Sequence, residues 1–424
     1  MTPELRIAMI GHEFMGSAHS QAWRVAPRFF DLPLRPVMAV LCGRDPGRTR
    51  AAADRLGWAE AATDWRAVVE RDDVDVVDIC APGDTHAEIA VAALAAGKHV
   101  LCEKPLANTV AEAEAMVAEA DRAAASGVRA MVGFTYRRVP ALSLARDLVA
   151  RGRLGRVHHV RAQYLQDWIV DPAAPLSWRL QKEKAGSGAL GDIGAHIVDA
   201  AQFVLGDTIA EVCGTMETFV TERPLAAEHS GLSGTAVSDR TGPVTVDDAA
   251  LFLARFTGGA LGSFEATRFA SGRKNALRIE VNGSAGSVAF DFEDMNVLHF
   301  FDGGEDAAVA GFRRIVVTEP DHPYVGAWWP PGHVLGYEHA FTHQAVDFVR
   351  AIAAGVDPSP SFGDGLRLQR VLAAVEASAA SRAWQAVEAS AASGARQAVQ
   401  GSAASGARQA VQGSDSTSAS RVGE

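Results

Sequence analysis

The chain has 424 residues, of which 48% are hydrophobic and 21% charged, and its formal net charge is −11. These values fit a protein with two globular domains and exclude a strongly basic chain, so we expect no nucleic-acid partner. No apolar run approaches the roughly 18 residues of a membrane span. The four cysteines lack zinc-ligand spacing, so we expect a cytoplasmic protein with reduced thiols, no membrane association and no metal site.

The first 135 residues alternate short apolar runs with Ala-rich helical stretches, which predicts a doubly wound parallel sheet covered on both faces. The expected strands are Leu5–Ile10, Val37–Leu41, Val74–Cys80, His99–Cys102 and Arg129–Val132. The expected helices are Ala18–Val25, Ala51–Leu56, Ala87–Ala96 and Val110–Ala125.

Downstream, several short strands with few helices predict an α+β domain on a largely antiparallel sheet, with one face open to a cofactor, a substrate or a partner subunit. The expected strands are Val157–Gln166, Ala210–Phe219, Ala249–Phe256, Gly259–Arg268, Leu277–Val281 and Ser287–Phe290. The expected helices are Asp192–Leu205, His339–Ala354 and Gly365–Trp384. The polar, Gly/Ser-rich segment Thr221–Val246 is expected to be a long loop or an insertion.

These patterns divide the chain into a nucleotide-binding domain at 1–135, a substrate and oligomerisation domain at 136–387 and a tail at 388–424. The tail repeats an Ala-, Gly- and Ser-rich unit that contains almost nothing large and apolar, so we expect it to be disordered.

A turn with glycines at both ends follows the first strand, in the order Gly11-His12-Glu13-Phe14-Met15-Gly16. Glycines allow a tight turn there, and the N-terminus of the next helix offers backbone N–H groups to a pyrophosphate. The turn predicts dinucleotide binding, although Glu13 stands where the usual pattern has glycine, and an ordinary strand-to-helix connection would look similar.

The second strand ends at Gly43-Arg44, without the carboxylate that usually binds a ribose 2′-hydroxyl. Arg44 therefore gives a slight preference for the 2′-phosphate of NADP. In the alternative reading, Asp45 caps the helix that starts at Pro46, and Arg44 is a solvated surface residue.

Lys104 follows the fourth expected strand, at the sheet edge where ligands bind, and Asp192 and His196 are spaced to share one helical face. Histidine is the natural base for removing a hydroxyl proton while a hydride leaves the same carbon. The glycines around Asp192 favour close approach of the backbone to a ligand. The alternatives are a surface lysine, an N-cap aspartate and an ordinary helix histidine.

Two further groups are weighed against ordinary packing. His339 and His343 share a helix face but lack a third metal ligand, so we interpret them as helix surface. The Trp328-Trp329 loop could pack or could stack on a sugar ring.

The Glu-Lys-Pro of Gly97–Pro105 and the Asp and His of Gly191–His196 resemble the glucose–fructose oxidoreductase/inositol dehydrogenase (Gfo/Idh/MocA) family, and the likeness covers about residues 5 to 385. Ala18-His19-Ser20 and Trp178-Arg179 resemble its levoglucosan-dehydrogenase-like branch. The resemblance implies a Rossmann domain followed by an α+β domain. It also implies hydride transfer between nicotinamide and a sugar, cyclitol or sugar derivative, in a homodimer or homotetramer.

Carried over residue by residue, Lys104 would orient the reacting hydroxyl and lower its pKa, His196 would be the acid/base, and Asp192 would orient the substrate or the imidazole. The residues expected to bind NAD(P) are Gly11, Phe14, Met15, Gly16, Gly43, Arg44, Ala81, Pro82, His86, Glu103, Lys104 and Arg137. Those expected to bind the substrate are Lys104, Tyr136, Trp168, Arg179, Asp192, His196 and Trp329.

Two other functions use the same scaffold. A redox-neutral lyase or glycosidase would use bound nicotinamide transiently, with the same lysine and histidine. A sensor that binds the cofactor without turnover would be expected to lack Lys104 or His196, and both are present.

Overall fold

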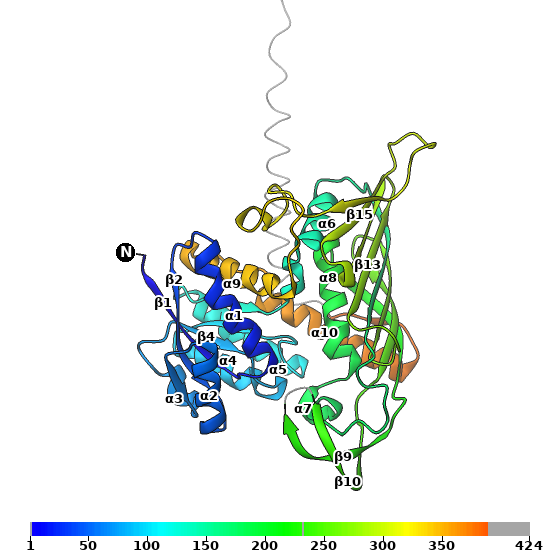
Figure 1. Cartoon of the computed structure of the whole chain (residues 1–424). Coiled ribbons are helices and arrows are strands. Elements are labelled where there is room, and N and C mark those ends of the chain that lie inside the picture. The colour runs from blue at the N-terminus through cyan, green and yellow to red at the C-terminus, as the bar shows by residue number, and fades with distance from the viewer. Residues whose placement is uncertain (1, 231–232, 389–424) are drawn as a thin grey trace, which may run out of the picture. The chain divides into compact units, whose positions relative to one another are not determined.

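The computed structural model describes residues 2–230 and 233–388, and Met1–Ala386 form one compact unit (Figure 1). Its first sheet has six parallel strands in the order β3-β2-β1-β4-β5-β6. The strands are β1 (Glu4–Ile10), β2 (Arg35–Cys42), β3 (Glu60–Ala62), β4 (Val76–Ile79), β5 (His99–Cys102) and β6 (Ala130–Val132). The helices between them are α1 (Phe14–Phe29), α2 (Pro46–Leu56), α3 (Trp65–Val69), η1 (Gly83–Thr85), α4 (His86–Ala95) and α5 (Val110–Ala124). The order reverses between β1 and β4, and the crevice at such a point binds ligands.

The predicted Rossmann fold is therefore confirmed, and local sequence explains it. Strand β4 is buried along its whole length, as expected for a strand covered by helices on both faces. Helix α5 starts at a capping box, in which Thr109 and Glu112 each bond the other's backbone N–H. Helix α2 ends at Gly57, whose left-handed conformation (φ +79°) suits glycine.

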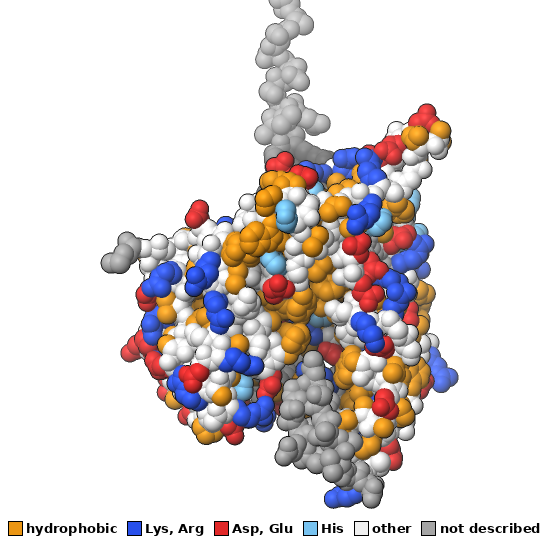
Figure 2. Space-filling view, in the orientation of Figure 1, with side chains coloured by type: hydrophobic (Ala, Val, Ile, Leu, Met, Phe, Trp, Pro, Cys, Tyr) orange, Lys and Arg blue, Asp and Glu red, His pale blue; other side chains and the backbone are white. Residues whose placement is uncertain are grey.

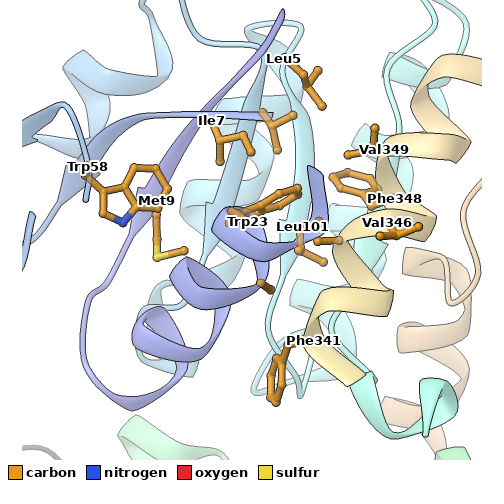
Figure 3. Packing of buried hydrophobic residues seen from close by; sticks show 14 of the residues in the cluster. Leu5, Ile7, Met9, Trp23, Trp58, Leu101, Phe341, Val346, Phe348 and Val349 are labelled. Carbon is orange, nitrogen blue, oxygen red and sulfur yellow. The ribbon is translucent and has the colours of Figure 1, made fainter. Parts of the chain in front are cut away.

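A helix from far downstream completes the core of this domain. Helix α9 (Tyr337–Ala354) packs on α1, and its Phe348 lies among Trp23, Ile7 and Leu101 (Figure 3). In the space-filling view, apolar side chains gather over the region of α1 and α9 (Figure 2). The core beside the first sheet thus includes a helix that the sequence division assigned to 136–387.

The second sheet has nine strands in the order β16-β15-β14-β13-β7-β12-β11-β8-β17. Only β7 and β12 pair in parallel, so the sheet is largely antiparallel, as predicted. Its strands are β7 (Val157–Leu165), β8 (Ile209–Glu217), β11 (Ala249–Phe256), β12 (Leu261–Thr267), β13 (Ala276–Gly283), β14 (Gly286–Asp291), β15 (Val297–Asp302), β16 (Arg313–Val316) and β17 (Gln385–Ala386).

Helices cover one face of this sheet, with α8 against β7 and β13 and α10 against β8 (Figure 1). The longer helices are α6 (Pro140–Ala150), α8 (Ala195–Leu205) and α10 (Phe362–Ser381). The short elements are η2 (Thr135–Arg138), η3 (Trp178–Leu180), α7 (Lys182–Ala185), the π-helical η4 (Leu190–Gly194), η5 (Phe292–Asp294) and η6 (Val325–Ala327). On the other face, Leu251 and Leu253 of β11 and Leu261 of β12 are about half exposed.

Of the two alternatives for Thr221–Val246, a long loop or an insertion, the long loop is wrong. This segment forms an antiparallel hairpin of β9 (Glu222–Ser230) and β10 (Ser233–Pro243). Leu225, Val244 and Val246 pack with a small apolar cluster that contains Leu176 and Leu180, and this burial anchors the hairpin.

Within the described residues, none of the helices is long and apolar enough to cross a bilayer. The predicted disordered tail falls at 389–424, outside the described residues.

Candidate active site

The glycine turn between β1 and α1 packs tightly against the chain's own backbone. A Cβ at Gly11, where φ is +99°, would lie 2.5 Å from the Cys80 carbonyl oxygen, and one at Gly16 would lie 2.3 Å from the Gly11 oxygen. No side chain caps the N-terminus of α1, so its first N–H groups are left for a pyrophosphate. Glu13 turns away from the helix N-terminus and pairs with Arg48 at 2.6 Å.

The ribose end of the crevice lies at the tip of β2. Asp45 caps α2 by accepting from Arg48 N at 2.7 Å, as the alternative reading expected. Gly43 packs so closely on the His12 ring that a Cβ there would lie 2.5 Å from it. Arg44 is exposed, and the structure gives it no ion pair among the described residues.

The other predicted cofactor groups surround the carboxyl ends of β4 and β5. His86 is buried and bridges two loops, with its ring nitrogens 2.9 Å from Ala81 O and 3.0 Å from Pro105 O. Pro82 is exposed beside it. Phe14 is 51% exposed and stacks on Tyr337 of α9, while Met15 packs against the domain core.

The three predicted catalytic residues meet at this edge. Lys104 Nζ donates to the Asp192 carbonyl oxygen at 2.6 Å and lies 3.5 Å from its Oδ1. Asp192 sits in the π-helical turn and His196 one turn later in α8, so both face the same way. Burial acts to raise the pKa of Asp192, but the charges of Lys104, Arg268 and Arg179 hold that pKa below its usual range.

His196 is held in its neutral form. Its imidazole stacks on Tyr136 at a centroid distance of 4.5 Å. Burial, followed by the positive charge of Lys104, lowers the pKa of His196 well below 6.5, although Asp192 opposes this shift. A neutral imidazole beside a cationic amine can accept a hydroxyl proton.

The glycines around Asp192 have a different role from the one expected. A Cβ at Gly188 would lie 1.8 Å from the Asp247 carbonyl oxygen, so the close approach there is to backbone rather than to a ligand. The Asp247 carboxylate accepts from Gly188 N and Leu190 N at 2.7 and 2.8 Å. These contacts fix the turn that presents Asp192.

A chain of polar side chains on the sheet joins two predicted substrate residues. Tyr136 OH lies 2.9 Å from Tyr164 OH, which donates to Asn275 Oδ1 at 2.7 Å. Gln166 Nε2 donates to the same oxygen at 2.8 Å, and Gln166 Oε1 accepts from Trp168 Nε1 at 3.0 Å. Sequence reasoning missed the middle of this chain, because only strand register brings β7 and the start of β13 together.

Two arginines complete the surroundings of Asp192. Arg179 lies over the Trp178 ring, and burial lowers the pKa of its guanidinium despite the charge of Asp192. Arg268, which the sequence did not single out, is fully buried with its Nη1 3.7 Å from Asp192 Oδ2. Its Nε and Nη1 have no hydrogen-bond partner among the described residues.

The structure does not bring Arg137 or Trp329 to this cluster. Arg137 forms a buried fork with both carboxylate oxygens of Asp199, which commits it to holding α8. Trp329 packs edge-on against Phe29, at the far end of the 16-residue helix α1, roughly 24 Å from the glycine turn at 1.5 Å per residue. The geometry assigns both residues to packing.

In the described part of the chain, neither the pair His339 and His343 nor His19 with its neighbours forms a metal site. His343 is buried rather than on the helix surface, and accepts from Trp328 Nε1 at 2.8 Å. His19, Asp78 and Cys80 form the one described group close enough to be considered as ligands. Both nitrogens of His19 already lie at hydrogen-bond distance from carboxylate oxygens.

A dinucleotide turn facing a lysine and a neutral histidine defines a nicotinamide-dependent dehydrogenase. Residues 5–134 match the sequence model of an oxidoreductase family with an NAD-binding Rossmann fold, and residues 142–289 match the GFO/IDH/MocA C-terminal domain. Levoglucosan dehydrogenase of Pseudarthrobacter phenanthrenivorans is 42% identical over 384 residues, which is 90% of this chain and 97% of that protein.

Solved structures of similar proteins point to the same family. An oxidoreductase domain protein from Kribbella flavida is 70% identical, with a TM-score of 0.87 over 91% of this chain and 100% of that one. A levoglucosan dehydrogenase in complex with NADH and levoglucosan is 41% identical, with a TM-score of 0.85 over 91% of this chain and 100% of that one. The chain belongs to the Gfo/Idh/MocA family of NAD-binding oxidoreductases.

Proposed function

We propose that this protein oxidises a ring hydroxyl of an anhydrosugar or a related pyranose, with NAD(P)⁺ as the hydride acceptor. The observation that carries the proposal is the cluster of Lys104, Asp192 and neutral His196 at the ligand-binding edge of the Rossmann sheet. Membership of the family makes the protein an NAD-dependent sugar oxidoreductase. The anhydrosugar rests on the similarity to levoglucosan dehydrogenase.

The site residues divide the reaction between them. The Lys104 ammonium would bind the reacting hydroxyl oxygen and lower its pKa, and His196 would take the proton. Asp192 holds Lys104 through its backbone oxygen and its carboxylate. Bound nicotinamide would supply the acceptor for the hydride that leaves the same carbon. The Gly11–Gly16 turn fits a dinucleotide, because no side chain caps the N-terminus of α1 and its first N–H groups can bind a pyrophosphate.

The substrate side is suited to a hydroxyl-rich ring. Trp168, which is 38% exposed, offers an aromatic face, and the chain from Tyr136 to Gln166 offers donors and acceptors. The half-buried Arg179 adds donors near Asp192. These groups support a neutral polyol more than an apolar alcohol.

NAD is the cofactor class of this family, and the preference for NADP stays a prediction. The exposed Arg44 and the absence of a carboxylate at the β2 tip support it, whereas the charge of Arg48 is already matched by Glu13. Comparing kcat/KM for NAD⁺ and NADP⁺ in the native protein and in Arg44→Ala tests it. A preference for NADP⁺ lost in the variant would support Arg44, and a preference for NAD⁺ unchanged by it would reject the role.

We further propose that the protein forms a homodimer or homotetramer through the open face of the second sheet. The half-exposed Leu251, Leu253 and Leu261 support an interface there. Light scattering of the native protein and of Leu253→Lys tests it, and a monomeric native protein would reject it.

We also propose that the protein is located in the cytoplasm. The four cysteines form no disulfide, and free thiols are typical of that reducing compartment.

The function is tested by absorbance at 340 nm, with NAD⁺ or NADP⁺ and a panel of anhydrosugars, pyranoses, cyclitols and glycosides. We expect turnover with levoglucosan or a near relative. Cofactor binding without turnover across the panel would reject the dehydrogenase and leave the redox-neutral enzyme or the sensor.

A further inference from the structure

A buried ionic cluster lies beneath the active-site edge, and the proposed reaction does not use it. His19, on the second turn of α1, is 2% exposed and points into the sheet. Its Nδ1 lies 3.0 Å from both carboxylate oxygens of Asp78, in the centre of β4. Its Nε2 lies 3.1 Å from Oε1 of Glu103, the residue directly before Lys104.

The geometry suits a ring that carries two protons. An ionised carboxylate can only accept hydrogen bonds, so two ionised carboxylates facing the two ring nitrogens are both satisfied when both nitrogens carry a proton. His19 is then an imidazolium. Burial opposes this charge, but Asp78 raises the pKa of His19 well above 6.5. Burial raises the pKa of the neighbouring Cys80 thiol to about 12, so Cys80 adds no charge.

The two carboxylates have different surroundings. Asp78 also accepts from Trp23 Nε1 at 2.7 Å, a contact between α1 and the sheet. Among the described residues, Glu103 Oε2 has the Lys104 backbone N–H as its one hydrogen-bond donor, at 3.3 Å. A Cβ at position 133 would lie 2.6 Å from Glu103 Oε1, so Gly133 makes room for this carboxylate.

Glu103 in turn borders the substrate side. Burial, followed by the nearby Tyr136 and the charge of Glu103, raises the pKa of Tyr337. Tyr136 stacks on His196. The carboxylate that His19 holds therefore lies between the Lys104 backbone and the aromatic residues that support the base.

We propose that His19 is a positioning residue: from beneath the sheet edge it clamps the Glu103 carboxylate and thereby fixes the backbone that presents Lys104 to the cofactor and the substrate. The proposal rests on the proposed function. A purely structural role for His19 would be to neutralise Asp78 so that α1 can pack on β4. That role uses Nδ1, whereas the clamp on Glu103 uses Nε2, so the two roles can be tested separately.

Two substitutions each keep one half of the clamp. The amide nitrogen of Asn stands close to a histidine Nδ1, and that of Gln close to Nε2. His19→Asn therefore keeps the hydrogen bond to Asp78 and loses the one to Glu103. His19→Gln keeps the hydrogen bond to Glu103 and loses the one to Asp78. Both variants remove the same charge, so each is the matched control of the other.

Both variants of the full chain are compared with the native protein by thermal unfolding, NADH affinity from calorimetry, and kcat and KM for the sugar. We expect His19→Gln to stay within about threefold of native kcat, and His19→Asn to lose tenfold or more, because small displacements near the reacting atoms are costly. The sugar KM should change little in either. Equal kcat and equal NADH affinity in the two variants, or a greater loss in His19→Gln, would overturn the proposal.

A third variant covers the case in which either substitution prevents folding. His19→Ala in an Asp78→Asn background removes the buried charge that His19 would otherwise neutralise. The double variant is compared with His19→Ala alone. If it regains stability but not kcat, the positioning role is supported, and if it regains both, the proposal is overturned. If the native protein turned over no sugar, the proposed function would fail separately, and NADH affinity alone would judge His19: weaker binding in His19→Asn than in His19→Gln supports the clamp, and equal binding overturns it.

Discussion

The cofactor side and the substrate side of the site are built from contacts of different range. On the cofactor side, Gly11 and Lys104 follow the ends of β1 and β5 within two residues, and His86 follows the end of β4 by seven. On the substrate side, Tyr164 and Asn275 meet although they are 111 residues apart in the chain. A local motif can specify the first side, whereas the second depends on how strands pair. Substitutions on one side should therefore leave the other side's function intact.

The largest effect is expected where the two sides meet. Lys104→Ala and His196→Ala should each lower kcat by a factor on the order of 10² to 10⁴, because each removes a group that handles the hydroxyl proton. NADH affinity should remain within a few-fold for His196→Ala. Steady-state kinetics and calorimetry measure both quantities, with the surface variant Lys182→Ala as the control. A His196→Ala enzyme with native kcat would contradict the assigned base.

A substitution confined to the cofactor side should weaken binding there. In Gly11→Ala the new Cβ would lie 2.5 Å from Cys80 O, so the turn that leads into the N-terminus of α1 must shift, and we expect NADH affinity to fall at least about tenfold. Gly97→Ala is the matched control, because Gly97 also has positive φ (+77°) but has nothing within 4 Å of its Cβ. It should lose about 1 kcal/mol of stability and no affinity. Equal loss of affinity in both variants would show that backbone strain, not the contact with Cys80, matters.

On the substrate side, Asn275→Ala should raise the sugar KM roughly tenfold, because Tyr164 and Gln166 both donate to its Oδ1. NADH affinity should not change. Asn282→Ala, near the other end of β13 and bonded to Glu280 and Ser287, is the control and should leave the KM unchanged. If Asn275→Ala changed the NADH affinity and left the sugar KM unchanged, the separation of cofactor and substrate functions would be contradicted.

The smallest effect concerns pH. Oxidation needs neutral His196, and its pKa is lowered well below 6.5, so kcat/KM should stay level as the pH falls through 6.5 and decline only at lower pH. In Asp192→Asn the carboxylate that raises this pKa is gone, so the acid limb should move to still lower pH. An acid limb centred at or above pH 6.5 in the native enzyme would contradict a neutral base.

The sequence predicted most of the fold, because burial patterns and caps act locally. Strand β5 was predicted with its exact bounds, and β1 and α5 to within a residue. The β9–β10 hairpin was missed because its sequence is polar and Gly/Ser-rich, and its pairing depends on apolar contacts with the distant Leu176 and Leu180. The packing of α9 on α1 was likewise beyond any local pattern.

In the site, placement at the sheet edge and the family resemblance predicted which residues cluster but not where each side chain points. Lys104, Asp192 and His196 meet as expected. Arg137 follows Tyr136 directly, yet the turn sends it to Asp199 while Tyr136 faces His196. Asn275 and Arg268 had no local signal, because only register and long-range packing place them.

The most direct test of the central claim is to count NADH formed for each enzyme molecule with excess NAD(P)⁺ and levoglucosan, together with the oxidised sugar. A dehydrogenase predicts many equivalents of NADH, matched one to one by keto-sugar. At most one equivalent of NADH per site, with the sugar eliminated, cleaved or unchanged, would contradict the account.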